Sequence, residues 1–516
     1  MGDASAPAVS ATTEVLASGH NEPQEQPMDN RQQWQPLIDE LNRRQSMAEA
    51  MGGEEKVARQ HGRGRLTARE RLERLFDPGT LHEIGALAGG NHPGGEPPLA
   101  GDGVVGGTGA VHGRTVVAMA EDFTVKGGSI GHANMAKRNR LVRLSLEQAL
   151  PLVIILDGAG ERASAGTERY PNTPNDLQLV ADLKGQVPVV SMVMGPSAGH
   201  GALTGMFADF IIMLEGAALF TAGPPLVEAA LGIQTTPEEL GSAHMHATQS
   251  GVVHNIAQSE EDAFAQARYF LSMLSPPAQP DSTTGASDHA IQTQDCDDLL
   301  DLIPPAGNAA YDMRQVLRVL VDEESLFELQ PGFGTSLIAG LARIGGVPCM
   351  LIANQPAVLA GAITHQAAEK ATHFIEVAQQ FDLPLVTLLD NPGVMPGAQS
   401  ERNGVLRAAG KMFLAQRRYR GRKVVVTLRK AFGFGSSVMG MNPWDRQAIN
   451  LALPTVSLGG VPAIGGDAAA KASADEAAQM QAVQAGAWVP ADSMAFDRVV
   501  APQALRRELI TVLQRA

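Results

Sequence analysis

Two stretches of the chain show the same pattern, in which a run of apolar, often β-branched residues breaks into a series of glycines. Residues 189–205 read VVSMVMGPSAGHGALTG, and residues 423–440 read KVVVTLRKAFGFGSSVMG. Each pattern predicts a buried strand that turns sharply into a helix, with glycine where the backbone must turn or approach a ligand. Because the first amides of a helix have no partner within it and are partly positive, each turn can hold a developing oxyanion.

Neighbouring segments also recur in the same order along the chain. The matched pairs are residues 107–123 with 340–356 and residues 146–166 with 378–397. Asp122 and Asp157 lie almost as far apart as Asn354 and Asp390, so the intervals match as well as the segments. Three matched blocks at matched intervals predict a tandem duplication of one α/β unit, with roughly 200 residues in each copy, a common domain size.

Length and composition predict how the chain is divided. Its 516 residues allow two or three domains with ample core. Residues 1–30 are polar, small and dotted with proline, and we expect a disordered tail there. A stretch rich in Pro, Ser, Thr and Asp indicates a linker, which we assign to residues 279–298. The two copies then occupy residues 31–278 and 299–516, and the first begins with a charged helical arm.

Charge and cysteine content exclude several classes of protein. The chain carries 40 Lys and Arg against 55 Asp and Glu, for a net charge of −15, which argues against nucleic acid or an anionic membrane as its main partner. With two cysteines, no disulfide framework or cysteine-based metal site is expected. No apolar run reaches transmembrane length and the start resembles no targeting segment, so we expect a cytoplasmic protein.

A third glycine-rich stretch, GGSIG at residues 127–131, leads into a predicted helix. That helix carries the cations Lys137, Arg138, Arg140 and Arg143. In one interpretation these side chains form a solvated helix face. In the other, some of them lie near the phosphates of a ligand, with the glycine turn beside it.

Most motifs that carry a defined chemistry are missing. The sequence has no Walker A loop and no H-E-x-x-H, and the glycines of residues 199–205 miss the dinucleotide fingerprint by one residue. His244 and His246 alternate, but alternating histidines alone are a weak metal signal, and we predict no metal site.

One motif indicates a different chemistry. Gly195 to Gly199 fit G-x-S-x-G, the nucleophile elbow of serine hydrolases, and they follow a predicted strand. The second copy has Ala431 where the first has Ser197, so both copies keep the glycine turn and only one has the hydroxyl. A serine hydrolase with Ser197 as its nucleophile remains an alternative.

Seven segments together resemble the carboxyltransferase β subunit of biotin-dependent acyl-CoA carboxylases, of the propionyl-CoA and methylcrotonyl-CoA carboxylase type. They are GRGRLTARERLERLFDPGT (62–80), EDFTVKGGSIG (121–131), GPSAGHGALTGMFADF (195–210), TPEELGSAHMHATQSGVVH (236–254), YDMRQVLRVLVDEESLFELQPGFGTSLIAGLARIGG (311–346), IANQPAVLAGAI (352–363) and KAFGFGSSVMG (430–440). The resemblance implies two crotonase-like domains in tandem, each a spiral of ββα repeats. It also implies a homo-hexamer whose active sites lie between the N-terminal half of one subunit and the C-terminal half of another.

The resemblance further implies a reaction with two anions, the enolate of an acyl-CoA thioester and the ureido oxyanion of biotin. In the family no side chain acts as the base, because the freed biotin takes the α-proton. By motif match, Gly199 and His200 serve the acyl-CoA oxyanion, and Phe434 and Gly435 serve the biotin oxygen. The positions expected to contact biotin or coenzyme A are Gly127, Gly128, Ser129, Arg162 and Gly433, and Ser437 stands where the family often has an acidic residue that helps to set acyl size.

The chain lacks an ATP-grasp signature and a biotinyl A-M-K-M tetrapeptide. The resemblance therefore implies a separate subunit with biotin carboxylase and biotin carrier domains. His200, Phe434, Ser437 and the segment 456–472 depart from the family pattern. These departures predict an unusual acyl substrate or a biotin-dependent acyl-CoA decarboxylase α-type subunit, and a non-catalytic scaffold in a carboxylase-like complex is a third possibility.

Overall fold

The computed structural model describes residues 29–90, 99–162, 176–274, 296–442, 445–460, 473, 475 and 486–515. The chain forms two compact units, Met1–Met47 and Ala48–Ala516. The described part of the first unit belongs to helix α1 (Asn30–Glu49), where a helical arm was predicted. Nearly all of the predicted tail at 1–30 and most of the predicted linker at 279–298 lie outside the described residues, so the domain boundaries stay a prediction.

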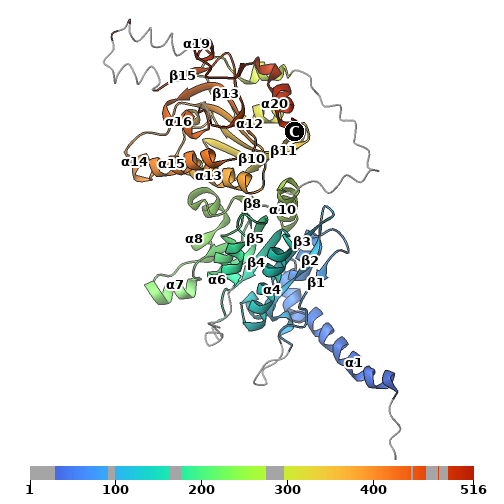
Figure 1. Cartoon of the computed structure of the whole chain (residues 1–516). Helices are drawn as coiled ribbons and strands as arrows, with labels where there is room; N and C mark the ends of the chain where they lie inside the picture. The colour runs from blue at the N-terminus through green and yellow to red at the C-terminus, as the bar shows by residue number, and fades with distance from the viewer. Residues whose placement is uncertain are drawn as a thin grey trace, which may run out of the picture. The chain divides into compact units, whose positions relative to one another are not determined.

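The first half of the larger unit is built on a sheet whose described strands number eight (Figure 1). They are β1 (His82–Glu83), β2 (Val104–Val111), β3 (Arg114–Glu121), β4 (Leu152–Gly158), β5 (Val189–Ala198), β6 (Phe210–Leu214), β7 (Ala218–Phe220) and β8 (Asn255–Ala257). Their order is β1-β2-β3-β4-β5-β6-β8, and β7 pairs with β5. The helices are α2 (Glu54–His61), α3 (Ala68–Leu75), α4 (His132–Gln148), α5 (Asp176–Asp182), α6 (Gly199–Gly205), α7 (Pro224–Leu231), α8 (Pro237–Gly241), α9 (Ala243–Met245) and α10 (Glu260–Leu274), with the short turns η1 (Ala100–Gly103), η2 (Lys126–Gly128) and η4 (His246–Ser250).

The second half is built on another sheet, again with eight described strands. They are β9 (Phe327–Leu329), β10 (Leu337–Ile344), β11 (Val347–Asn354), β12 (Leu385–Asn391), β13 (Lys423–Phe432), β14 (Gln447–Ala452), β15 (Ser457–Gly459) and β16 (Arg498–Val499). Their order is β16-β14-β13-β12-β11-β10-β9, and β15 pairs with β13. The helices are α11 (Asp298–Leu302), α12 (Met313–Leu320), α13 (His365–Gln380), α14 (Ala398–Arg402), α15 (Val405–Arg418), α16 (Gly433–Val438), α19 (Trp488–Asp492) and α20 (Leu505–Leu513), with the turns η5 (Leu359–Gly361) and η6 (Pro502–Ala504).

The two sheets repeat one hydrogen-bonding plan. In each, an antiparallel hairpin, β2–β3 or β10–β11, leads into parallel strands. Strands β4 and β5 pair from their first residues onward, as do β12 and β13. Both of these ladders shift register near their carboxyl ends, after Leu156 in the first sheet and after Leu389 in the second. Because even this irregularity recurs at the matched place, the structure confirms the predicted duplication.

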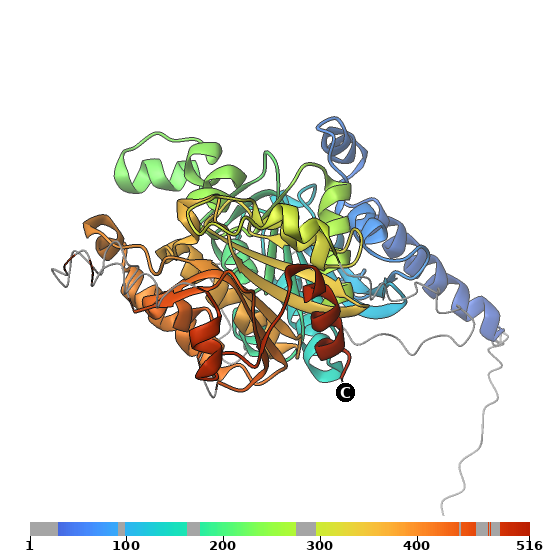
Figure 2. The same cartoon turned by 90° about the horizontal axis from the view of Figure 1, so that it is seen from above.

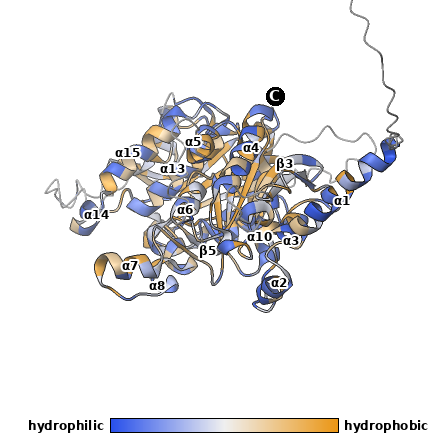
Figure 3. Cartoon of the chain, turned by 90° about the horizontal axis from the view of Figure 1, so that it is seen from below, coloured by the Kyte–Doolittle hydropathy of each residue, from blue (hydrophilic) through white to orange (hydrophobic). Residues whose placement is uncertain are grey.

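Helices cover both faces of the second sheet because its central strands are apolar on both sides. Every residue of β12 is buried. Leu385 and Leu389 belong to the core shared with α13 and α15, which lie side by side (Figures 1 and 3). Val386 and Leu388 point to the opposite face and join the core of α12 and α20. Figure 2 shows the dark red helix α20 beside the yellow strands of this sheet.

The two halves of the larger unit share one apolar core. The ring of Phe210 in β6 stacks on that of Phe270, with centroids 4.8 Å apart, and meets the edge of Phe327 from the second half at 5.8 Å. The rings of His254 and His373 lie 4.6 Å apart at the same junction. This packing holds the halves together through the β6–β8 edge of the first sheet.

Candidate active site

The first glycine turn joins the end of β5 to the start of α6, as the sequence predicts. Gly199 begins the helix with a φ of +55°, a left-handed conformation that costs other residues roughly 1–2 kcal/mol and that glycine adopts readily. A Cβ atom on Gly201 would lie 2.8 Å from Oε1 of Glu121, so this position also requires glycine.

The second glycine turn is built in the same way between β13 and α16. Gly433 begins the helix with a φ of +57°. A Cβ atom on Gly435 would lie 2.6 Å from Oδ1 of Asn391, so a buried polar side chain again lies directly beneath the first helical turn. Both predicted strand-to-helix turns are thus confirmed, one at the carboxyl end of a central strand in each sheet.

The main-chain amides of these turns are available to a ligand. Among the described residues, neither the amides of His200 and Gly201 nor those of Phe434 and Gly435 have an acceptor outside their own helix. A pair of free N–H donors at a sharp turn is the arrangement that binds an oxyanion. The structure therefore puts suitable donors where the sequence predicts them, while the assignment of one turn to each substrate stays a prediction.

A chain of charged side chains lies beneath the first turn. Nε2 of His200 is 2.5 Å from Oδ1 of Asp176, and Oδ2 of Asp176 accepts a hydrogen bond of 2.5 Å from Nε of Arg138. The same guanidinium donates from NH1 to Oε1 of Glu121 at 3.1 Å. Oε2 of Glu121 then accepts the backbone N–H of Asp157 at 2.9 Å, which ties the network to the end of β4.

Burial alone raises the pKa of a carboxyl group, and here the two acids respond differently. Burial raises the pKa of Glu121, and the charge of Arg138 offsets this only in part. For Asp176 the opposing effects of Arg138 and His200 outweigh burial, so its pKa lies well below the usual range. Asp176 is therefore an anion that accepts the Nε2–H of His200 and fixes the orientation of the ring. Sequence reasoning missed Asp176 and Glu121 because they are far from the turn along the chain.

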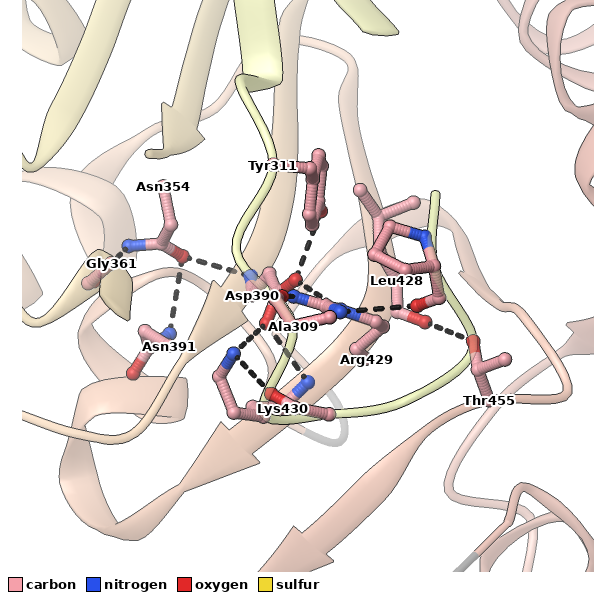
Figure 4. A network of polar contacts seen from close by, with 12 residues as sticks. Ala309, Tyr311, Asn354, Gly361, Asp390, Asn391, Leu428, Arg429, Lys430 and Thr455 are labelled. Atoms are coloured by element: carbon pink, nitrogen blue, oxygen red, sulfur yellow. Dashed lines mark hydrogen bonds and ion pairs between the residues drawn. The ribbon is translucent and has the colours of Figure 1, made fainter. Parts of the chain in front are cut away.

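Beneath the second turn, Asn354 takes the place of Glu121 (Figure 4). Its Oδ1 accepts the backbone N–H of Asp390 at 3.1 Å, as Glu121 accepts that of Asp157, and both contacts span 36 positions. The matched segments 107–123 and 340–356 already place Asn354 opposite Glu121, so the interval counted from Asp122 starts one residue too late. The reason is that β3 ends at Glu121, whereas Asp122 has already left the strand and bonds to Thr124.

Asp390 is the centre of a second buried network (Figure 4). Its Oδ2 accepts hydrogen bonds from Nε of Arg429 at 2.7 Å and from the hydroxyl of Tyr311 at 2.9 Å, and Lys430 pairs with Oδ1 at 2.9 Å. Burial first, and then the charge of Asp390, raise the pKa of Tyr311 well above its usual value. The remaining donors of Arg429 bind the carbonyls of Pro304, Ala306 and Ala309. Arg429 thereby fastens the loop before α12 to the strand that carries the second turn.

The stretch at 127–131 forms a tight turn against β4. Gly127 and Gly128 both have a φ of +65°, and a Cβ atom on Gly128 would lie 2.5 Å from the carbonyl oxygen of Asp157. Arg162 pairs with Asp102 at 2.7 Å and donates to the hydroxyl and the carbonyl of Ser129. Arg162 thus holds this turn in shape, and a contact of these residues with coenzyme A or biotin stays a prediction.

The interpretation of the α4 cations as a solvated helix face is wrong for two of them, and a position of others near phosphates stays a prediction. Lys137 and Arg138 are buried rather than solvated, and their partners are protein groups. Lys137 donates to the carbonyl of Val104 at 2.7 Å, and burial lowers its pKa to about 8. Arg140 and Arg143, in contrast, are exposed. The helix has buried residues around much of its circumference, so spacing alone does not show which cations point inward.

Ser197 does not form a nucleophile elbow. It lies inside β5, where it pairs with Gly158 and Leu219, and it is fully buried. Its hydroxyl has no hydrogen-bond partner among the described residues. An elbow instead exposes the serine at the turn itself, next to a histidine base, and here the turn residue is Gly199. The geometry excludes the serine hydrolase alternative.

Phe434 and Ser437 both lie in helix α16, which begins at the second turn. Phe434, in the first turn of α16, is 53% exposed. Ser437 follows in the same helix, and its carbonyl accepts hydrogen bonds from Gln416 and Asn442. The selection of substrate by Ser437 stays a prediction. Part of the predicted unusual segment 456–472 lies outside the described residues.

Metal-binding side-chain groups and membrane-spanning helices were also sought among the described residues. Among the described residues, no group of three or more His, Cys, Asp or Glu side chains could hold a metal ion. No helix in that part of the chain is both long and apolar enough to cross a membrane.

Known proteins resemble this chain over most of its length. The carboxyl transferase domain model matches residues 59–511. The biotin-dependent acetyl-/propionyl-coenzyme A carboxylase beta5 subunit of Mycobacterium tuberculosis (strain CDC 1551 / Oshkosh) is 36% identical over 430 residues, which cover 81% of this chain and 78% of that protein. The methylmalonyl-CoA decarboxylase subunit alpha of Veillonella parvula is 35% identical over 406 residues, covering 77% and 79%.

The chain also resembles a solved structure over most of its length. Transcarboxylase 12S, described as a hexamer with methylmalonyl-coenzyme A bound, matches with a TM-score of 0.85 at 30% identity, over 93% of this chain and 95% of that one. This match confirms the predicted tandem pair of crotonase-like α/β domains. The chain belongs to the carboxyl transferase domain family, as a carboxyltransferase of the biotin-dependent acyl-CoA carboxylase type.

Proposed function

We propose that this chain moves a carboxyl group from carboxybiotin, carried by a partner subunit, to the α-carbon or vinylogous carbon of an acyl-CoA. The turn with Gly199 and His200 holds the thioester oxygen, and the turn with Phe434 and Gly435 holds the ureido oxygen of biotin. One observation carries the proposal: both halves present free main-chain amides at a glycine with a positive φ, at the end of a central strand.

Two turns suit this reaction because it forms two anions. Loss of CO2 from carboxybiotin leaves negative charge on the ureido oxygen, and removal of the α-proton leaves an enolate at the thioester. Fixed N–H donors stabilise such charges without reorganisation, and the loss of one donor typically costs about 3–4 kcal/mol. Both charges are transient, so the amides raise kcat more than they tighten substrate binding.

The proposal requires a partner with biotin carboxylase and biotin carrier domains, and we infer a homo-hexameric core. Exposed apolar side chains support an oligomer. Helix α7 buries none of its residues, and its Leu226 and Leu231 are 65% and 69% exposed. In the second half, Leu406 and Phe434 are also exposed. Patches of this kind mark interaction surfaces, and the related transcarboxylase 12S is described as a hexamer.

The test is carboxylation of a panel of acyl-CoA thioesters with labelled bicarbonate, ATP and the biotinylated partner subunit. We expect incorporation of label into at least one acyl-CoA, and none when the partner lacks its biotin. Absence of label with every acyl-CoA, despite a partner that is itself carboxylated, would refute the proposal.

Decarboxylation of an acyl-CoA is the second candidate function, because one of the relatives is a methylmalonyl-CoA decarboxylase subunit alpha. The same two turns serve this direction, since the enolate and the ureido oxyanion form in reverse order. Incubation with unlabelled biotinylated carrier and a labelled carboxyacyl-CoA separates the two. Transfer of label to the carrier that exceeds the rate of ATP-dependent carboxylation would favour the decarboxylase.

A further inference from the structure

A cavity of about 660 Å³ lies between the two halves of the larger unit. Its walls come from the β2–β3 hairpin, the loop before β4, the end of α10 and the β10–β11 hairpin. Arg114 is the first residue of β3 and Arg343 the penultimate residue of β10, and both line it. The cavity is therefore at the amino ends of the strands of the first sheet, whereas the glycine turns follow the carboxyl ends.

Both arginines lack an acidic partner. Neither forms an ion pair with any described residue, and NH1 of Arg114 is buried without a hydrogen-bond partner there. Among the described residues, the guanidinium group of Arg343 donates only to the carbonyl of Gly346 in its own hairpin, at 3.3 Å. The buried arginines Arg71, Arg138 and Arg429, in contrast, all pair with carboxylates. Two guanidinium groups that line one cavity without a carboxylate are a feature of sites for anions.

The neighbouring charges do not neutralise this pair. Burial and the positive charge of Arg343 lower the pKa of Arg114, so the two guanidinium groups repel each other across the cavity. Burial, and then the charge of Arg268, lower the pKa of His112. Two acidic groups lie nearby, and both are already engaged, Asp77 by Arg268 at 2.7 Å and Asp322 by Arg506 at 2.8 Å and the amides of Gly345 and Gly346. The cavity wall itself contains two arginines and no acidic side chain.

Much of the rest of the wall is apolar, with Leu150, Leu271 and Pro348 among its residues. His112, Thr115 and Ser272 add polar groups to it. Its volume lies within the range of small-molecule sites, which is about 300–1,000 Å³. We propose that this cavity binds a small organic oxyanion, a phosphate or carboxylate, between Arg114 and Arg343, with the apolar part of the ligand against these walls. Such a ligand bridges the two halves at a distance from the glycine turns, so it would act as an effector rather than as a substrate.

The test is thermal unfolding of the full chain at constant ionic strength, titrated separately with inorganic phosphate, adenosine monophosphate and butyrate. We expect a saturable rise in Tm with at least one of these probes, and the probe that binds tightest identifies the class of ligand. The variants Arg114→Gln and Arg343→Gln should weaken that affinity at least ~10-fold. In anion-free buffer at low salt, both variants should unfold at or above the Tm of the wild type, because they remove a like-charge contact.

Arg143→Gln is the matched control, because Arg143 is an exposed arginine outside the cavity, and it should bind the probe as the wild type does. Three results would overturn the proposal. They are no saturable effect of any probe, a saturable effect that survives in Arg114→Gln and Arg343→Gln, and an equal, unsaturable effect in all variants, which indicates an adventitious ion only. A large loss of Tm in both arginine variants without anion would also count against it, because the arginines would then be structural.

Discussion

Replacing the first residue of each helical turn by alanine tests whether the two glycine turns carry the chemistry. Gly199 and Gly433 have φ values of +55° and +57°, so alanine there costs roughly 1–2 kcal/mol if the turn keeps its shape. A Cβ atom on Gly199 has its nearest neighbour at 3.6 Å, so it meets no clash, whereas one on Gly433 lies 3.1 Å from the carbonyl of Gly460. If the backbone relaxes to a negative φ instead, the next amide turns away from its oxyanion.

The expected effect follows from the donor that is lost. Loss of one oxyanion donor lowers kcat about 10²–10³-fold, which corresponds to about 3–4 kcal/mol, and should leave KM nearly unchanged. The assay is the partner-dependent carboxylation of the best acyl-CoA. In addition, release of CO2 from the carboxylated carrier without acyl-CoA should be slowed by Gly433→Ala and not by Gly199→Ala.

Gly79→Ala is the control. Gly79 has a φ of +74° and no atom within 4 Å of an added Cβ, so the substitution imposes the same backbone strain outside the turns. Its kcat should match that of the wild type. The reasoning is refuted if Gly199→Ala and Gly433→Ala keep a kcat within about 2-fold of Gly79→Ala while all three fold, because the turn amides would then not bear on the transition state.

Three further predictions concern stability and are measured by urea unfolding. Arg138→Leu removes the guanidinium group that two buried carboxylates share, and it should lower the free energy of unfolding by about 3–5 kcal/mol. Leu at the exposed Arg140 should change it by under ~1 kcal/mol, and equal losses would contradict the network. Gly410→Ala, inside α15 with open space around its Cβ, should raise it by about 0.5–1 kcal/mol, and a loss would show that the site is not open. Burial lowers the pKa of His254 and of His373, the latter to about 4, so the unfolded chain binds more protons than the folded chain below about pH 6.5. The free energy of unfolding should therefore fall as the pH drops from 6.5 towards 4, by roughly 3 kcal/mol for His373. A His373→Gln variant with an unchanged dependence on acid pH would contradict this.

The parts of this fold that sequence predicts are those set by local pattern. The runs at 189–198 and 423–432 are rich in Val and other apolar residues and are followed directly by glycine, which is why both strands and both turns are found where the pattern puts them. The duplication follows for the same reason, because matched local patterns recur in one order. The sequence does not show at which residue a strand ends, however, so the interval is counted from Asp122 where the structure uses Glu121.

The charged networks could not be predicted, because their members are distant along the chain. His200, Asp176, Arg138 and Glu121 come from four separate elements, and only packing brings them into contact. The sequence of α4 also does not show which of its cations are buried, because the spacing of apolar residues does not distinguish a cation paired in the core from one in water. Arg162 shows the same limit, because its ion pair with Asp102 joins segments 60 positions apart.

The two copies neutralise a matched carboxylate, Asp157 in the first and Asp390 in the second, with arginines from different elements. In the second copy, Arg429 from the neighbouring strand pairs with Asp390. The matched strand position in the first copy is Gly195, and no side chain fits there, because a Cβ atom would lie 2.0 Å from Oδ1 of Asp157. Asp157 is instead paired with Arg71 from α3 at 2.8 Å. The side chain beneath the turn also differs, being the carboxylate of Glu121 in the first copy and the amide of Asn354 in the second, while the positive φ of the first glycine and the free main-chain amides are the same. The proposed oxyanion role depends on the glycine φ and the free main-chain amides, and these are the features that both copies keep.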